Sequence, residues 1–301
     1  MAVQIPFRRE LEFTYGEVAQ VSAGIRRVIA KNPSPFTLYG TGTYIIGHGD
    51  VAVIDPGPAD KAHINAILEA TRGERITHVL ITHTHMDHSP GWALLRDHCD
   101  AQSYAYGPHG AGKHEAGVPV EEGGDMAFVP DVRVKDGDII EGRGWSVECV
   151  YTPGHTSNHM CFQYREEKAL FTGDHVMGWS TSVISPPDGD MAAYMASLER
   201  LLAREDKVYW PTHGTSIDEP KTLVRAFIAH RLEREEQVLA CVSRGVGRIR
   251  DMVPLMYVGT PEFMYPAAAR SVLAAVEYLV QKGELQCEGK VGLDADYRLK
   301  R

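Results

Sequence analysis

Through about residue 210, short apolar runs alternate with amphipathic periodic segments, a pattern that predicts a layered α/β protein. The apolar runs predict strands at residues 44–46, 51–54, 77–82, 103–106, 146–152, 160–164, 169–172 and 208–210. A Gly-His-Gly-Asp turn between the first two predicts a hairpin. Helices are expected at 60–71, at 191–203, and after Ser89-Pro90, with Ser89 as the cap and Pro90 as the first helical residue.

From about residue 220 the pattern changes to three helices and a terminal hairpin. The helices are expected at 221–244, at 249–257, and in a segment that Thr260-Pro261 opens and that includes 272–282; the hairpin is expected at 283–301. This order is similar to a small winged-helix unit. We therefore predict two domains, one of residues 1–219 and one of residues 220–301.

Composition narrows the class of protein. The chain has 301 residues, 44% of them hydrophobic and 24% charged, which excludes a collagen-like, mucin-like or wholly disordered chain. Its net charge of -9 disfavours general binding to nucleic acid or anionic membranes, although residues 230–301, with 11 basic and 10 acidic residues, are the less acidic part. Five scattered cysteines, no signal-peptide core and no 18-residue apolar run predict a cytoplasmic protein without membrane association.

A dense group of ionisable side chains follows the predicted strand 77–82. Within six residues the chain carries His83, His85, Asp87 and His88. Imidazoles and carboxylates are natural ligands of zinc and similar divalent ions. Packed together without a cation, they would repel one another or lie unsatisfied, so the cluster predicts a metal site.

Three more residues of ligand type come after strands. His155 follows the strand at 146–152, Asp174 the strand at 169–172, and His213 the strand at 208–210. The carboxyl ends of strands form the edge where α/β proteins build their sites. The pattern therefore predicts that four strands deliver ligands to one place.

The motif His-Thr-His-Met-Asp-His at 83–88, followed in order by His155, Asp174 and His213, resembles the metallo-β-lactamase superfamily over most of residues 36–215. The resemblance implies a four-layer αβ/βα sandwich, with residues 1–219 as the catalytic domain and a binuclear site at one edge. It implies that one divalent ion is held by His83, His85 and His155, the other by Asp87, His88 and His213, and that Asp174 bridges them. Asp55, in an Asp-Pro-Gly element, would support the site, although such a sequence also simply forms turns.

Two divalent ions ~3.5–4 Å apart can share a hydroxide, lower its pKa and polarise a scissile carbonyl. We therefore expect this hydroxide to attack an ester, thioester or lactone-type carbonyl of a small-molecule substrate, with zinc as the metal and manganese or iron as alternatives. Asp87 and His230 are the candidate catalytic residues. Antibiotic-degrading members of the superfamily have a Cys where this chain has Asp174, and oxygen-reducing diiron members have a Glu where it has His85, which disfavours those two activities.

An alternative function is metal-dependent RNA hydrolysis. The segment 230–237 and the winged-helix-like tail are similar to a group of lactamase-like proteins that includes a single-strand-specific endoribonuclease. His230 would then contact phosphate or substrate, unless it is a helix-surface residue among charge pairs. Arg244, Arg248 and Arg250 would contact phosphates or form a solvated face, and the tail lacks the mixed aromatic and basic stretch of single-strand binders.

A third hypothesis is a non-enzymatic protein that binds nucleic acid or a partner around structural metals. Structural zinc sites are closed by four ligands, whereas seven ligands for two ions leave positions open. Several other residues have two interpretations. His109 and His114 lie in the segment 107–124, a candidate lid, but they and His175 are also explained as solvent-exposed. His159 supports His155 or starts a strand, and Trp179, Pro186 and Pro187 form an apolar wall or a packed loop.

Overall fold

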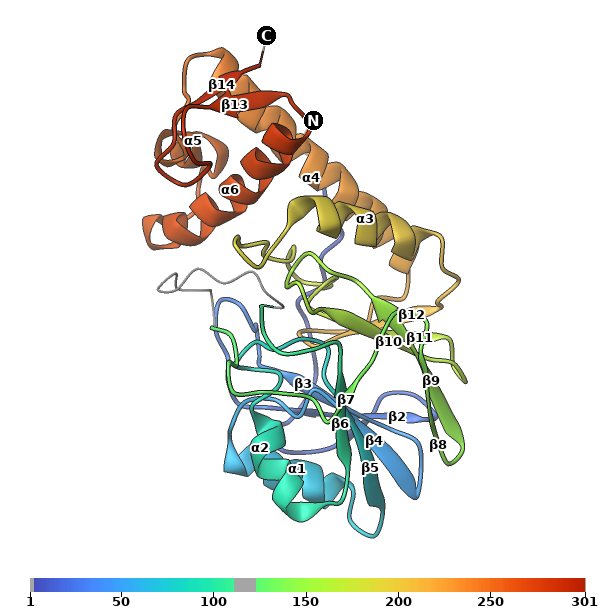
Figure 1. The fold of residues 1–301 in the computed structure, drawn as a ribbon. Helices are drawn as coiled ribbons and strands as arrows, with labels where there is room; N and C mark the ends of the chain where they lie inside the picture. Colours follow the sequence, from blue (N-terminus) through green and yellow to red (C-terminus); the bar gives the residue numbers. More distant parts are fainter. Residues whose placement is uncertain (1–2, 111–122, 301) are drawn as a thin grey trace.

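Figure 1 shows the computed structural model, which describes residues 3–110 and 123–300, so His114 lies outside the described residues. Two β-sheets face each other. The first has the order β1 (Ala19–Gln20), β2 (Ile25–Ile29), β3 (Gly42–Ile46), β4 (Asp50–Ile54), β5 (Arg75–Leu80), β6 (Gln102–Ala105) and β7 (Val132–Arg133). The second has the order β12 (Val208–Pro211), β11 (Ala169–Gly173), β10 (Met160–Tyr164), β9 (Trp145–Tyr151) and β8 (Ile139–Gly142).

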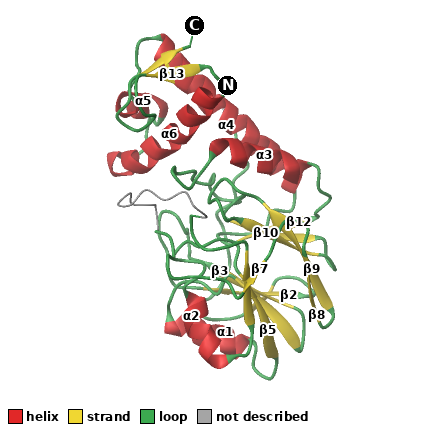
Figure 2. Cartoon of the chain, in the orientation of Figure 1, coloured by secondary structure: helices red, strands yellow, loops and turns green. Residues whose placement is uncertain are grey.

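Helices cover the outer face of each sheet, as the separation of red helices and yellow strands in Figure 2 makes clear. A short pair, α1 (Lys61–Ala70) and α2 (Gly91–Leu95), packs on the first sheet, and α3 (Met191–Leu202) and α4 (Pro220–Ser243) pack on the second. Apolar and aromatic side chains fill the core between the sheets, with Tyr44 from one sheet meeting Phe171 from the other at a ring distance of 5.0 Å. The four layers confirm the predicted αβ/βα sandwich.

Strand direction explains why distant segments meet at one edge. In the first sheet β4, β5 and β6 are parallel. In the second sheet β9 and β11 both run antiparallel to β10, and β11 is parallel to β12. The carboxyl ends of β9, β11 and β12 therefore lie together. Two backbone hydrogen bonds near this edge join the sheets, from Met160 N to Thr82 O (2.7 Å) and from Gly42 N to Thr212 O (2.8 Å).

The C-terminal unit consists of α5 (Ile249–Met256), a 3-10 turn (Glu262–Met264), α6 (Tyr265–Gln281) and the antiparallel pair β13 (Leu285–Cys287) and β14 (Tyr297–Leu299). Helix α4 joins this unit to the sandwich. Its early residue Phe227 packs in the core against the second sheet, whereas its later residue Val238 packs in the core of the C-terminal unit. The predicted domain boundary before residue 220 stays a prediction, because one continuous helix contributes to both cores.

Two local expectations differ from the structure. Strands β1, β2, β7 and β8 were not predicted, since they are short or interrupted by charged residues. Helix α2 begins at Gly91, and Ser89 does not cap it. The Ser89 hydroxyl instead donates to the buried carboxylate of Asp125 at 2.8 Å, although Asp125 lies 36 residues further along the chain. A carboxylate forms a stronger, charge-assisted hydrogen bond. Among the described helices, none has the length and apolar character needed to cross a membrane.

Candidate metal centre

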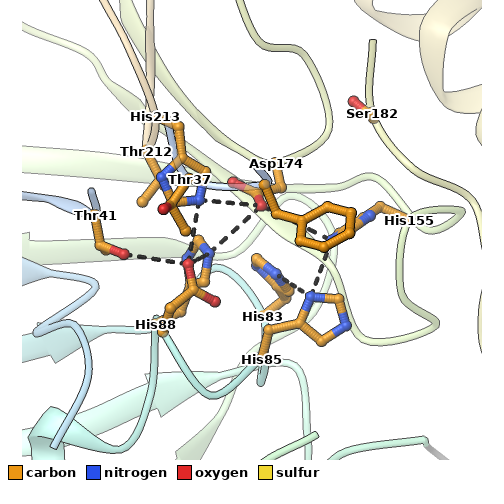
Figure 3. Close-up of polar contacts among 12 residues, drawn as sticks. Thr37, Thr41, His83, His85, His88, His155, Asp174, Ser182, Thr212 and His213 are labelled. Carbon is orange, nitrogen blue, oxygen red and sulfur yellow. Dashed lines mark hydrogen bonds and ion pairs between the residues drawn. The ribbon is translucent and has the colours of Figure 1, made fainter. Parts of the chain in front are cut away.

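The seven predicted ligands are buried where the strands end, and Figure 3 shows the histidines and Asp174 lying together. His83, His85 and His155 form one group, in which Nδ1 of His85 lies 3.1 Å from Nε2 of each of the other two. Asp87, His88 and His213 form a second group, in which Oδ2 of Asp87 lies 3.2 Å from Nε2 of both histidines. Within each group the candidate ligand atoms lie within 4.8 Å of one another. The structure thus brings together the two sets that the sequence predicted.

Asp174 lies between the two groups (Figure 3). Its Oδ2 is 3.4 Å from Nε2 of His213, 3.6 Å from Nε2 of His88 and 4.0 Å from Nε2 of His155. The preceding Gly173 has a φ of +50°, and a Cβ on it would approach Nε2 of His159 to 2.6 Å. Glycine at this position therefore allows the turn that directs Asp174 inward, at a distance from both groups that suits a shared ligand.

Hydrogen bonds on the outer side of the cluster orient three of the imidazoles. Nδ1 of His88 donates to Oδ2 of Asp55 at 2.9 Å, Nδ1 of His155 to the Val183 carbonyl at 2.6 Å, and Nδ1 of His213 to the Gly40 carbonyl at 3.1 Å. In the neutral imidazole, a proton held on Nδ1 leaves the lone pair on Nε2, which is the atom that faces the cluster. Histidines that ligate metals are typically held in this way.

The electrostatics of the cluster also fit cations. Burial and the neighbouring histidines hold the pKa of His83 well below its usual range, so its imidazole is neutral. Burial opposes ionisation of Asp87 and Asp174, but the charges of His88 and His213 hold the pKa of both carboxyls well below the usual range. One oxygen of each carboxylate, Oδ1, is buried without a hydrogen-bond partner among the described residues. The two carboxylates raise the pKa of His88 and His213, whereas burial lowers that of His83, His85 and His155. Divalent metal ions would take the place of the protons on His88 and His213 and would bind the neutral imidazoles and the unpartnered carboxylate oxygens.

Asp55 connects three strand ends to the cluster. Its carboxylate accepts hydrogen bonds from Thr82 N (2.8 Å), Thr82 Oγ1 (2.7 Å) and Thr212 Oγ1 (3.2 Å), in addition to the bond from His88. Its φ of +50° is rare for a residue other than glycine. The residue therefore does more than form a turn, because it ties the ends of β4, β5 and β12 to one ligand.

Three other histidines differ from their interpretation in the sequence. His109 and His175 are buried, 5% and 0% exposed, whereas solvent exposure was expected. The His109 ring lies 2.9 Å from Thr84 Oγ1, and the His175 ring packs against Tyr194, where burial lowers its pKa to about 3. Nε2 of His159 accepts from the backbone N of Asp174 at 3.3 Å, so its support goes to Asp174 rather than to His155. Packing of distant segments caused these differences, and no local pattern reveals it.

A cavity of 110 Å³ lies beside the cluster and exposes three predicted ligands, His85, His155 and Asp174. The rest of its lining is apolar or neutral and comes from Pro35, Phe36, Met177, Trp179, Ser180, Thr181, Val183 and Met264. Trp179 is thus a wall of this inner cavity. Pro186 does not line it, and its carbonyl accepts a hydrogen bond from Arg270 of α6 at 3.1 Å. Met264 belongs to the C-terminal unit, which therefore reaches the inner cavity.

His230 lies elsewhere, in a second cavity of 440 Å³ that shares Trp179, Ser180 and Thr181 with the inner one. Its role in catalysis stays a prediction, and the described structure places it on α4 away from the lining of the inner cavity. Arg248 and Arg250 are exposed and lie 3.7 Å from Asp296 and 3.8 Å from Asp251, as expected for a solvated face.

Sequence reasoning missed several neighbours of the site. Thr41 donates its hydroxyl to Oδ2 of Asp87 at 3.1 Å, and the carbonyls of Gly40 and Val183 hold His213 and His155. The apolar residues Phe36 and Met264 were missed as well. A lone threonine, a backbone carbonyl or a single apolar residue carries no motif, so nothing in the sequence marked them.

Comparison with known proteins agrees with this geometry. The sequence pattern of the metallo-beta-lactamase superfamily matches residues 37–213, and that of the beta-lactamase associated winged helix domain matches residues 249–292. The lactamase-like protein adaB of Aspergillus niger is 34% identical over 264 residues, which cover 83% of this chain and 77% of that protein. The atrochrysone carboxyl ACP thioesterase of Claviceps purpurea is 33% identical over 232 residues, covering 76% and 68% of the two chains.

A beta-lactamase domain protein from Burkholderia ambifaria has a similar crystal structure, with a TM-score of 0.78 and 19% identity over 98% of this chain and 97% of that one. The chain belongs to the metallo-β-lactamase superfamily. It is a metal-binding hydrolase of that superfamily with a C-terminal winged-helix domain. The family and fold class predicted from the motif at 83–88 are therefore confirmed.

Proposed function

We propose that the protein is a binuclear metal-dependent thioesterase that hydrolyses the thioester of a carbon-rich acyl group. The observation that carries the proposal is the inner cavity, where an apolar wall faces the converged ligands His85, His155 and Asp174. Similarity to a thioesterase from Claviceps purpurea supports the choice of a thioester.

In this proposal His83, His85 and His155 hold one divalent ion, Asp87, His88 and His213 hold the other, and Asp174 contacts both. Zinc is the proposed metal, with manganese and iron as alternatives. When bound, such a pair of ions activates water and polarises the scissile carbonyl. Asp87 and Asp174 neutralise only part of their charge, so the site favours a transition state in which the carbonyl oxygen becomes negative.

The lining of the inner cavity favours a thioester over substrates with poorer leaving groups. A thiol with a pKa of ~8.5 leaves as its anion around neutral pH, so its departure needs no general acid. Apart from the predicted ligands, the described lining residues are apolar or, like Ser180 and Thr181, carry a neutral hydroxyl. Phe36, Met177, Trp179 and Met264 exclude water and hold the acyl carbons against the reacting carbonyl.

The test is a comparison of substrates that share an acyl group. The zinc- or manganese-loaded protein is assayed with octanoyl and benzoyl thioesters of N-acetylcysteamine, the matching oxoesters, a lactone, a phosphodiester and short RNA. We expect the highest kcat/KM for the thioesters, complete dependence on added metal in chelator-treated protein, and loss of activity in Asp87→Ala but not in the exposed control Asp100→Ala. Cleavage of RNA or phosphodiester without thioester turnover would overturn the proposal and favour the ribonuclease hypothesis.

A further inference from the structure

The second cavity has two contrasting walls. Helix α4 supplies His230, Arg234 and Gln237, whereas the N-terminal segment supplies Ile5, Phe7 and Arg9. Trp179, Ser180 and Thr181 border it on the side of the inner cavity, because they line both. The metal centre and a larger space of 440 Å³ therefore lie on two sides of the same three residues, and a long substrate that occupied both would cross this border.

The cation on the α4 wall is held in place by its neighbours. Nη1 of Arg234 donates to the Met256 carbonyl at 2.8 Å and to Oε1 of Gln237 at 2.9 Å. Its guanidinium also lies over the Tyr257 ring, 4.5 Å from the centroid. These contacts leave Nη2 without a described hydrogen bond. A fixed guanidinium loses little side-chain entropy when it binds an oxyanion.

His230 adds an unused donor to the same wall. Nε of Arg234 donates to Nε2 of His230 at 3.4 Å, so the proton of the neutral imidazole is on Nδ1. Nδ1 is buried and has no hydrogen-bond partner among the described residues. Burial and the charges of Arg231 and Arg234 lower the pKa of His230 to about 4, which keeps the ring neutral. The residue lines the second cavity, and its Nδ1 keeps a hydrogen-bonding capacity that no described residue uses.

The wall formed by the N-terminal segment is anchored to the sandwich and to α4. The backbone N of Arg8 donates to the Gly178 carbonyl at 2.8 Å, and the Phe7 ring packs edge-on against Phe227 at 6.3 Å. The backbone N of Val3 donates to Oε2 of Glu233 at 3.1 Å, so this carboxylate is partly occupied. Two cations, Arg9 and Arg234, thus face one acidic residue in a chain whose overall charge is -9.

We propose that the second cavity binds the phosphate-bearing arm of a thiol carrier, the phosphopantetheine chemistry that acyl carrier proteins and coenzyme A share. The inference rests on the proposed thioesterase function, because the acyl group would occupy the inner cavity and the thioester sulfur would lie near the Trp179–Thr181 border. Gln237 and Ser180 suit the amide groups of the arm, Ile5 and Phe7 suit its methyl groups, and Arg234, Arg9 and His230 suit its phosphate.

Kinetics with one acyl group on different carriers test the phosphate contact. Octanoyl thioesters of N-acetylcysteamine, pantetheine, phosphopantetheine, coenzyme A and a carrier protein are compared for the wild type, Arg234→Gln, His230→Ala and the control Arg225→Gln. Arg225 is exposed on the same helix and lines neither cavity. We expect Arg234→Gln to raise KM ~10-fold for the three phosphate-bearing substrates and to leave the other two unchanged, as for loss of one charge-assisted hydrogen bond. The lower KM of coenzyme A or of the carrier protein identifies the source of the arm.

Direct binding separates this site from the proposed reaction. Calorimetry of the metal-free full chain with phosphopantetheine and with pantetheine needs no turnover. We expect phosphopantetheine to bind ~10-fold more tightly than pantetheine, and this preference to be lost in Arg234→Gln and His230→Ala but kept in Arg225→Gln. Equal binding of the two compounds overturns the site even if thioesters are cleaved, whereas a phosphate preference without thioester cleavage overturns only the proposed function. Circular dichroism and thermal unfolding check the fold of each variant.

Discussion

The ligand edge of the sandwich and the C-terminal unit are built on opposite principles. At the ligand edge, polar side chains are buried and most have an outer partner, as with His88 on Asp55 and His155 on the Val183 carbonyl. The C-terminal unit has an apolar core that includes Val272 and Tyr297, and its Arg248 and Arg250 lie on the surface beside acids. The difference teaches that the candidate chemistry is concentrated where strands end, and that Met264 brings the C-terminal unit to the inner cavity.

Removal of Asp174 is expected to have the largest effect on the ligand edge. Asp174→Ala deletes the oxygen that lies near both groups, so we expect the protein to bind one or two fewer metal ions. We expect kcat/KM for thioesters to fall by more than ~10²-fold, because loss of a residue that only supports a ligand typically costs ~10–100-fold. Metal analysis and kcat/KM measure this. Asp218→Ala, which breaks an exposed ion pair with Arg8, is the control and leaves both values unchanged. Full activity in Asp174→Ala would contradict the role of the ligand edge in the reaction.

Acid is expected to destabilise the sandwich rather than the C-terminal unit, since residues 244–300 contain no histidine. His63 on α1 is buried beside Thr43, and burial lowers its pKa to about 4 from its usual 6.5. Between pH 6.5 and about 4 the unfolded chain binds a proton at His63 that the folded protein does not bind. The free energy of unfolding is therefore highest above pH 6.5 and falls by up to ~3 kcal/mol as the pH drops from 6.5 to about 4. Chemical unfolding of the metal-free protein measures it. His63→Gln should flatten the decline, and an identical decline in both proteins would contradict the assignment.

Asp55→Asn is expected to weaken metal binding by ~10–100-fold, because it removes the carboxylate that holds the Nδ1 proton of His88. Competition with a chromogenic chelator gives the affinity. Asp60→Asn is a matched change in the segment that follows the same strand, where Asp60 caps α1 through Ala62 N. The two variants should differ in metal affinity but have similar free energies of unfolding. Equal metal affinities would show that Asp55 forms the turn without supporting the metal centre.

Met264→Ala should have the smallest effect and tests whether the C-terminal unit reaches the substrate. We expect kcat/KM to fall ~10-fold for octanoyl or benzoyl thioesters and to change little for acetyl thioesters, as for the loss of a few methylene contacts. Phe263→Ala is the control, because that neighbour is 75% exposed and does not line the inner cavity. A uniform fall for every acyl group would show that Met264 supports the fold and not selectivity.

Much of the molecule was predictable because its signals are local. The apolar runs located the principal strands, and the hairpin of β3 and β4 formed at the expected Gly-His-Gly-Asp turn. The histidines and aspartates that could bind metal were also recognisable in the sequence, because each group follows an apolar strand, namely β5, β9, β11 or β12. Strands such as β1 and β7, with two residues each, have no pattern of their own and depend on pairing with a neighbour.

The sequence by itself determined the family, the layered fold and the group of seven ligand-type residues, since each depends on residue type and on spacing along the chain. Only the tertiary structure decided which imidazole nitrogen faces the cluster and that His109 and His175 are buried. It also decided that Met264 and Arg234 border two cavities that share the lining residues Trp179, Ser180 and Thr181. These properties arise from contacts between segments far apart in the chain. Their free energy depends on how layers pack and which polar atoms lose water, and local patterns of residues do not encode either.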